Sequence, residues 1–286
     1  ISVGAPKSIS LWFDDTERGL AMGIYMTAPT LGSMTGLSLT NSLFMPLLEG
    51  DWRGVLLLYA AFIFFSSLVW WLITAHKGYK VIEERQSSRR PESEHKNILR
   101  LIKIPAFQIV LTMAIGIFFF NHGFNNWLPE ILRAKGMNAV HAGNFASIPV
   151  FCAVISSLTI PRLAKPKWRI TILFFIFLGF GLSSLALQAS EDTYLFVALV
   201  LQGLARGSAM TLSILVLLDI PGVGKERAGV AGGMFFSAAE IGGVMGPVSI
   251  GIVSDISDGF SYPLYMLSGV SILLLVLLVW LKTQQN

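Results

Sequence analysis

The stretch GLAMGIYMTAPTLGSMTGL at residues 19–37 returns in related form as GVAGGMFFSAAEIGGVMGP at residues 229–247. Small residues are identical at one constant offset, and the identical pairs are Gly19/Gly229, Ala21/Ala231, Gly23/Gly233, Ala28/Ala238, Gly32/Gly242 and Gly36/Gly246. A repeat of such long period inside a hydrophobic chain is typical of a duplicated helical membrane bundle, the plan of many secondary transporters. The repeat therefore predicts a duplicated membrane protein.

Composition supports the same class of protein. Apolar residues make up 53% of the chain and charged residues 13%, about half the roughly 25% of a globular protein. Several apolar runs reach or exceed the roughly 20 residues that a helix needs to cross a bilayer. We therefore expect an all-α polytopic membrane protein.

The apolar runs divide the chain into two bundles and a connector. We expect one partial span at 1–13 and complete spans at 19–43, 54–75, 104–127, 140–160, 170–189, 193–218, 228–253 and 263–281. Residues 76–103 are polar, charged and rich in Ser and Arg, which is typical of a surface linker. Residues 1–75 would then close an N-terminal bundle with a partial helix and two complete ones, and 104–286 would form a six-helix C-terminal bundle.

The basic residues give the orientation. Seventeen of the 21 Lys and Arg fall on one side of these spans, eight of them in the linker. The positive-inside rule places that side, the linker and the C-terminus in the cytoplasm of a multi-pass cell (inner or plasma) membrane protein. The two repeat copies lie six spans apart and share an orientation, so we expect twelve helices in all, with about three of them, roughly 100 residues, ahead of Ile1.

This layout resembles the major facilitator superfamily. DWRG at 51–54 looks like the short turn before the sixth helix of that family, and NWLPEIL at 126–132 is similar to a connection between the seventh and eighth helices of its cyanate/nitroimidazole-type porters. The resemblance implies a secondary active transporter that works by alternating access. PRLAK at 161–165 lacks the Asp of the family's loop signature, and GGVMGP at 242–247 resembles the antiporter signature but stands in the other half, which disfavours drug–proton antiport.

Three of the expected spans carry ionisable residues: Arg206 and Glu240 lie near the middle of their spans, and His122 lies toward the outer end of its span. An Arg at mid-membrane costs about 2.5–3.5 kcal/mol on insertion scales, so such a residue is a functional candidate by default. Arg206 would hold an anionic substrate group with its planar fork, and Glu240 would take up a proton. Alternatively, the two neutralise each other as a buried structural pair. Both interpretations stay open.

Neighbouring polar residues extend the candidate site. Gln202 lies four residues before Arg206 on the same helical face, and His122 and Asn125 share a face at a spacing of three. We expect Arg206, Gln202, His122 and Asn125 to bind substrate. The alternative for the residues of 104–127 is solvation at the membrane interface, just before the helix ends at Pro129.

Two further sets of residues are candidates for the conformational change. Glu17-Arg18 and Glu226-Arg227 each precede a repeat copy on the cytoplasmic side, where they would form gating salt bridges and cap helix starts. Small-xxx-small stripes let helix backbones approach closely. We expect the stripes to pack at a moving interface between the halves, and they consist of Gly32, Gly36, Gly242 and Gly246.

The function that follows is transport of a small solute through the lipid bilayer, with an organic anion as one candidate solute and protons as one candidate coupling ion. The alternative is a transporter-like sensor or receptor without transport. The spans hold no paired groups suited to catalysis, so we do not expect an enzyme. No nucleotide-binding motif occurs, and we expect no cofactor and no metal. We also expect no nucleic-acid partner, because the basic residues follow membrane topology. The oligomeric state predicted is a monomer.

Overall fold

The computed structural model describes residues 28, 31–32, 35–36, 38–75, 94–189 and 192–285. Over these residues the chain is built from helices joined by short turns, and seven helices are long and apolar enough to cross a membrane. The predicted all-α polytopic fold is confirmed. The predicted partial helix at 1–13 and most of the predicted span at 19–43 lie outside the described residues.

The described elements follow one another along the chain with few long connections. They are a π-helical turn η1 (Thr40–Phe44), α3 (Met45–Leu47), α4 (Trp52–Thr74), α6 (Glu94–Ile102), α7 (Pro105–Ala134), α8 (Ala139–Leu163), a 3₁₀ turn η2 (Pro166–Trp168), α9 (Arg169–Ala186), α10 (Asp192–Asp219), α11 (Gly224–Ser257) and α12 (Ser261–Gln285). Side chains cap two of the starts: the carboxylate of Asp51 accepts from the Arg53 amide at 3.0 Å, and the amide oxygen of Asn138 accepts from the His141 amide at 2.9 Å.

The predicted end of α7 at Pro129 is wrong. Pro129 lies inside the helix, which continues to Ala134. A proline inside a helix removes one N–H donor and need not stop the helix when the surrounding bundle holds both sides of it. The helix stops where Gly136 takes a φ of +96°, a backbone conformation that favours glycine. The motif at 126–132 is therefore helical, and the connection to α8 begins after it.

The predicted linker at 76–103 contains a helix that the sequence analysis did not anticipate. Its last third forms α6, and Leu101 in that helix is fully buried. α6 lies against α7 and α11, so this part of the connector belongs to the surface of the bundle. The apolar residues of α6 are few and spaced at helical intervals, and such a pattern is easily overlooked in a charged segment.

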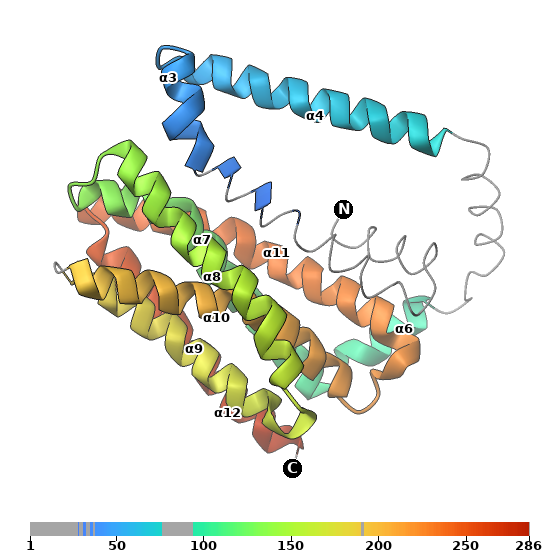
Figure 1. Ribbon diagram of the computed structural model, residues 1–286. Helices are drawn as coiled ribbons and strands as arrows, with labels where there is room; N and C mark the ends of the chain where they lie inside the picture. The colour runs from blue at the N-terminus through green and yellow to red at the C-terminus, as the bar shows by residue number, and fades with distance from the viewer. Residues whose placement is uncertain are drawn as a thin grey trace.

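Helices α7 to α12 form one bundle with an internal three-plus-three arrangement. α7 packs against α11 and α12, and α10 packs correspondingly against α8 and α9 (Figure 1). α7 and α10 occupy equivalent places in the two sets of three helices and run in opposite directions. This is the arrangement of inverted repeats within one half of a transporter. Aromatic stacking fills the centre, where the rings of Phe120 and Phe180 lie 4.3 Å apart. The Ser271 hydroxyl donates to the Phe177 carbonyl at 2.5 Å and joins α12 to α9.

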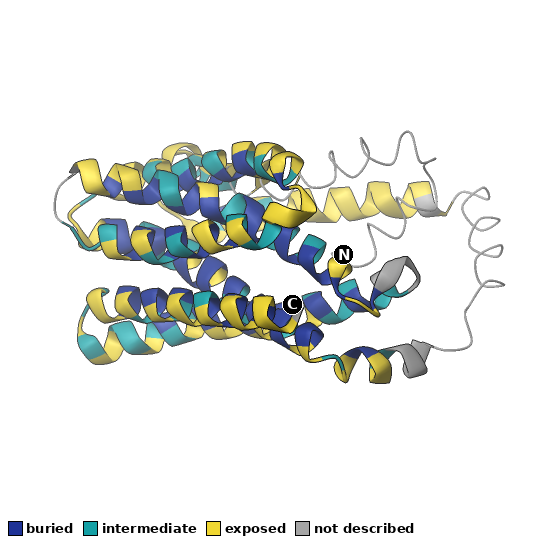
Figure 2. Cartoon of the chain, turned by 90° about the horizontal axis from the view of Figure 1, so that it is seen from below, coloured by how far each residue is buried: buried dark blue, intermediate teal, exposed yellow. Residues whose placement is uncertain are grey.

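Helix α4 stands apart from this bundle in Figure 1, and most of its surface is exposed in Figure 2. None of its most apolar 18-residue window is buried, although this is one of the most hydrophobic helices of the chain. The short turn before it, η1, lies against α8. Apolar surface of this extent is expected to meet lipid or other helices of a membrane protein.

Candidate functional site

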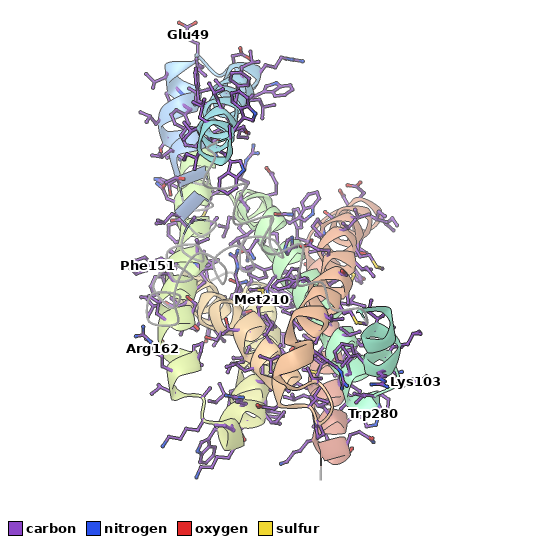
Figure 3. The ribbon with its side chains drawn as sticks, turned by 90° about the vertical axis from the view of Figure 1, so that its right-hand side faces the viewer. Glu49, Lys103, Phe151, Arg162, Met210 and Trp280 are labelled. Carbon is purple, nitrogen blue, oxygen red and sulfur yellow. The ribbon has the colours of Figure 1, made fainter. Side chains whose placement is uncertain are left out.

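The polar residues predicted on α7 and α10 meet across the interface of these two helices. Arg206 is partly buried, and its Nη1 donates to Oδ1 of Asn125 at 2.7 Å. The amide nitrogen of Asn125 donates to the backbone carbonyl of Asn121, one turn earlier, which fixes the Asn125 side chain. Met210, one turn further along α10 than Arg206, lies between α8 and α11 in the view of Figure 3. The bond from Arg206 to Asn125 therefore places this part of the site at the interface between α7 and α10.

Arg206 does not form the structural pair with Glu240 that the sequence left open. Among the described residues the ion pairs are Glu130–Arg133 and Arg169–Asp219, and neither includes Arg206 or Glu240. The neutral amide of Asn125 orients the guanidinium without cancelling its charge. A guanidinium has five N–H donors, so one bond to Asn125 leaves donors for a further partner.

His122 and Glu240 come together beside a glycine of α11. A Cβ placed on Gly243 would lie 3.3 Å from Oε2 of Glu240 and 3.5 Å from Nδ1 of His122, so the two side chains share the space in front of this glycine. The His122 ring also stacks on Phe118 one turn away, at 5.2 Å between centroids. His122 lies three residues before Asn125 on α7, so His122 and Glu240 adjoin the bond between Arg206 and Asn125.

Two prolines change the backbone of this neighbourhood. Because Pro129 has no N–H, the carbonyl of Asn125 loses its usual donor four residues ahead, and Pro247 has the same effect on the carbonyl of Gly243. The indole of Trp127 on α7 donates to the carbonyl of Pro247 on α11 at 2.9 Å. Polar backbone groups thus accompany the polar side chains of the site, a feature tolerated in membranes where the groups line a cavity or meet other helices.

Two buried amides of the site have unused hydrogen-bonding atoms. Gln202 is fully buried, and neither its oxygen nor its nitrogen has a partner among the described residues. Oδ1 of Asn121, a residue 9% exposed, is likewise unpartnered within that part of the chain. In the same described ranges no group of three or more His, Cys, Asp and Glu side chains could hold a metal ion.

The glycines of the second repeat copy pack within the C-terminal bundle. A Cβ on Gly242 would overlap the carbonyl oxygen of Ile115, and one on Gly246 would overlap that of Phe119, both on α7. These contacts join α11 to α7 of the same bundle, and a role of the two glycines at an interface between the halves stays a prediction. Gly32 and Gly36 have no described atom within 4 Å of a Cβ, so a role at a moving interface between the halves stays a prediction.

A second close glycine pair joins α10 to α8, and the sequence analysis overlooked it. Gly203 and Gly207 approach the backbone of Pro149 and Ala153 so closely that a Cβ on either glycine would overlap it. Their spacing of four residues was the available signal. These contacts hold α10 in the rotation that directs Arg206 toward α7.

Of the predicted gating residues, the described structure reaches Arg227, which lies near the start of α11. Its Nη1 donates to the carbonyl of Gly222 at 2.5 Å, a contact within the preceding turn. The side chain of Glu226, and both Glu17 and Arg18, lie outside the described residues. The gate stays a prediction.

The sequence analysis missed an ion pair at the ends of three helices. Nη1 of Arg169 lies 2.5 Å from Oδ2 of Asp219, joining the start of α9 to the end of α10. Nε of the same arginine donates to the carbonyl of Ala164, just after α8. The sequence shows an Arg and an Asp at the ends of two apolar runs, but their pairing depends on the fold, which brings the two helix ends together.

Comparison with known proteins agrees with this architecture. The sequence profile of the Major Facilitator Superfamily matches residues 1–188. The chain is 22% identical, over 88% of its length and 60% of the relative, to the uncharacterized transporter YycB of Bacillus subtilis. It is 24% identical to a quinolone resistance transporter of Acinetobacter baumannii, over 97% of this chain and 68% of that one.

A third relative is a probable chloroplastic anion transporter of Arabidopsis thaliana, 23% identical over 88% of this chain and 51% of its own. The chain thus spans 60% of the length of the Bacillus relative and about half of the plant one. With a family match over more than half of its residues and seven helices able to cross a membrane, the chain belongs to the Major Facilitator Superfamily.

Proposed function

We propose that this chain is part of a secondary active transporter that moves a small anionic solute by alternating access, with protons as the coupling ion. The observation that carries the proposal is the bond between Arg206 and the neutral side chain of Asn125. A charge inside a membrane segment is costly and persists where it serves a function. Since no acid among the described residues pairs with Arg206, its charge is available to an anionic ligand.

Glu240 and His122 support the proton-coupling part of the proposal. Both groups can gain or lose a proton, and they share the space beside Gly243 on facing helices. Arg206 is bonded to Asn125, three residues from His122, so an anion bound at Arg206 would change the electric field around this pair. Substrate binding and protonation would be linked through that field, which is the requirement for symport.

The cellular setting of the proposal follows from topology. A multi-pass protein of the cell membrane with a cytoplasmic C-terminus, acting as a monomer, fits the distribution of basic residues. Rocking of two bundles would open the site to each side in turn, and Glu17, Arg18, Glu226 and Arg227 would close it on the cytoplasmic side.

Uptake by proteoliposomes containing the full-length protein tests the proposal. A panel of small anionic, neutral and cationic solutes of similar size identifies the charge class, with and without an inwardly directed proton gradient. We expect Arg206→Ala to abolish uptake of the anionic solute, and Glu240→Gln to leave exchange intact while removing acceleration by the gradient. Arg133→Ala is the matched control, because Arg133 is an exposed arginine paired with Glu130, about two turns beyond Asn125 at the end of α7. Unchanged uptake in Arg206→Ala would overturn the site assignment.

A further inference from the structure

The unpartnered amides of Gln202 and Asn121 adjoin the bond between Arg206 and Asn125. Gln202 is one turn from Arg206 on α10, and Asn121 is one turn from Asn125 on α7. The 2.7 Å bond between Arg206 and Asn125 holds these two helical turns against each other. Because α7 and α10 run in opposite directions, Gln202 and Asn121 lie on opposite sides of this bond, each about one helical turn from it.

Unpartnered amides are concentrated in this region. The buried side-chain atoms without a partner among the described residues are Asn121 Oδ1, Gln202 Oε1, Gln202 Nε2 and Gln188 Nε2. Three of these four atoms are in the site, and Gln188 follows the end of α9. A buried polar group without a hydrogen bond costs roughly 1–3 kcal/mol, whereas leucine of similar size would pack in the same place without that cost. Such a cost is tolerated where a ligand supplies the missing bond.

The oxygens of the two amides need partners that donate a hydrogen bond. Asn121 Oδ1 and Gln202 Oε1 are acceptors, so their partner must donate a proton. A plain carboxylate offers acceptors only, and it could satisfy Arg206 but neither of these oxygens. An O–H beside a carboxylate supplies both, and its oxygen can also accept from Nε2 of Gln202. A small molecule with an anionic group and a hydroxyl therefore suits both parts of the site.

We propose that the site selects small hydroxylated carboxylates, with the carboxylate on Arg206 and a hydroxyl on the amide of Gln202 or, on the other side of the bond to Asn125, on that of Asn121. This inference rests on the proposed transport of an anion. A site built to bind a substrate hydroxyl rejects the analogue that lacks it, because the amides then stay unpartnered. For one hydrogen bond we expect a preference of about tenfold, near the upper end of the net contribution of such a bond.

Titration calorimetry on the detergent-solubilised full-length protein tests the preference with matched ligand pairs: lactate against propionate, and tartrate against succinate. Wild type should bind the hydroxylated member of at least one pair about tenfold more tightly. Gln202→Leu and Asn121→Leu should bring that ratio close to one while keeping the affinity for the plain carboxylate. Gln188→Leu is the control, because it removes a buried amide outside the site and should keep the wild-type ratio.

The outcomes separate this inference from the proposed function. If plain and hydroxylated carboxylates bind equally well to wild type, and Arg206→Ala removes both, the anion site stands and the hydroxyl preference is wrong. If no anion binds and only neutral or cationic solutes of the panel do, the proposed function fails and the inference fails with it. The melting temperature of ligand-free Gln202→Leu should equal or exceed that of wild type. A clear decrease would show that the amide is structural and would also overturn the inference.

Discussion

At the scale of single residues, the partner of Arg206 decides what the site is able to bind. The amide of Asn125 accepts one hydrogen bond and carries no charge, so the guanidinium stays a full cation with donors to spare. A carboxylate in the same place would form a bidentate ion pair and compete with any anionic solute. The chemistry of position 125 is therefore as important to anion binding as that of position 206.

This argument predicts opposite consequences for two substitutions of Asn125. Asn125→Ala removes the orienting bond but leaves the charge, so we expect KM for the anionic solute to rise by about tenfold or less. Asn125→Asp keeps the shape of the side chain and places a negative charge against Arg206, so anion uptake should fall far more. Uptake kinetics in proteoliposomes measure both. If Asn125→Asp retained at least the activity of Asn125→Ala, the role given to Arg206 would be wrong.

The sequence identified the participants of the site but not their pairing. Arg206, Gln202, His122 and Asn125 stand out because polar residues are rare in apolar helices. Which of them meet depends on the rotation of α7 against α10, which is set by packing of uncharged residues such as Gly203. Sequence spacing within each helix contains no information on that rotation. For this reason the approach of His122 to Glu240 across Gly243 was not predicted.

At the scale of elements, α11 has two halves with different surroundings. Its later half lies directly against the backbone of α7 through Gly242 and Gly246. In its earlier half, Gly229, Gly232 and Gly233 have no described atom within 4 Å of a Cβ. The glycines of this helix are thus tightly packed on one side of the candidate site and have no close described neighbour on the other, where Ala231 and Phe235 are buried.

This asymmetry predicts the effect of alanine along one helix. Gly242→Ala would push a methyl group into the carbonyl of Ile115, and we expect a loss of about 1–3 kcal/mol in stability. Gly233→Ala meets no described atom and raises helix propensity by up to about 1 kcal/mol, so it should be neutral or stabilising. Thermal denaturation of the two variants in the same detergent compares them. Equal melting temperatures would refute the packing described for α11.

Helix existence was predictable from the apolar runs, whereas some helix ends were not. The sequence placed the end of α7 at Pro129, because proline commonly terminates helices. The bundle around α7 holds the residues after Pro129 in helical conformation, and a single sequence does not show that support. α6 was missed for the opposite reason: its apolar face is too short to stand out in the charged connector.

At the scale of the whole molecule, the packing of α7 to α12 does not determine how the bundle is oriented across the membrane. The same packing is possible with either end facing the cytoplasm. Only the unequal distribution of Lys and Arg distinguishes the two orientations. The direction of the bundle is therefore a prediction from sequence.

Single-cysteine labelling tests this orientation. The chain has one native cysteine, Cys152, so Cys152→Ala gives a suitable background. A cysteine at Ala134, the exposed last residue of α7, should react with a membrane-impermeant maleimide added to intact cells. A cysteine at Thr283, exposed near the end of α12, should react only after the membrane is permeabilised. The reverse pattern would invert the proposed topology.

The hydrogen bond from the Trp127 indole to the carbonyl of Pro247 has an optical consequence. Indole emission responds to the polarity around its N–H group, and this N–H has a partner on a different helix. Any sliding of α11 along α7 would exchange that carbonyl for water or lipid and shift the emission wavelength. In a protein that keeps Trp127 and carries phenylalanine at its other tryptophan positions, the fluorescence wavelength would therefore report any such sliding during transport.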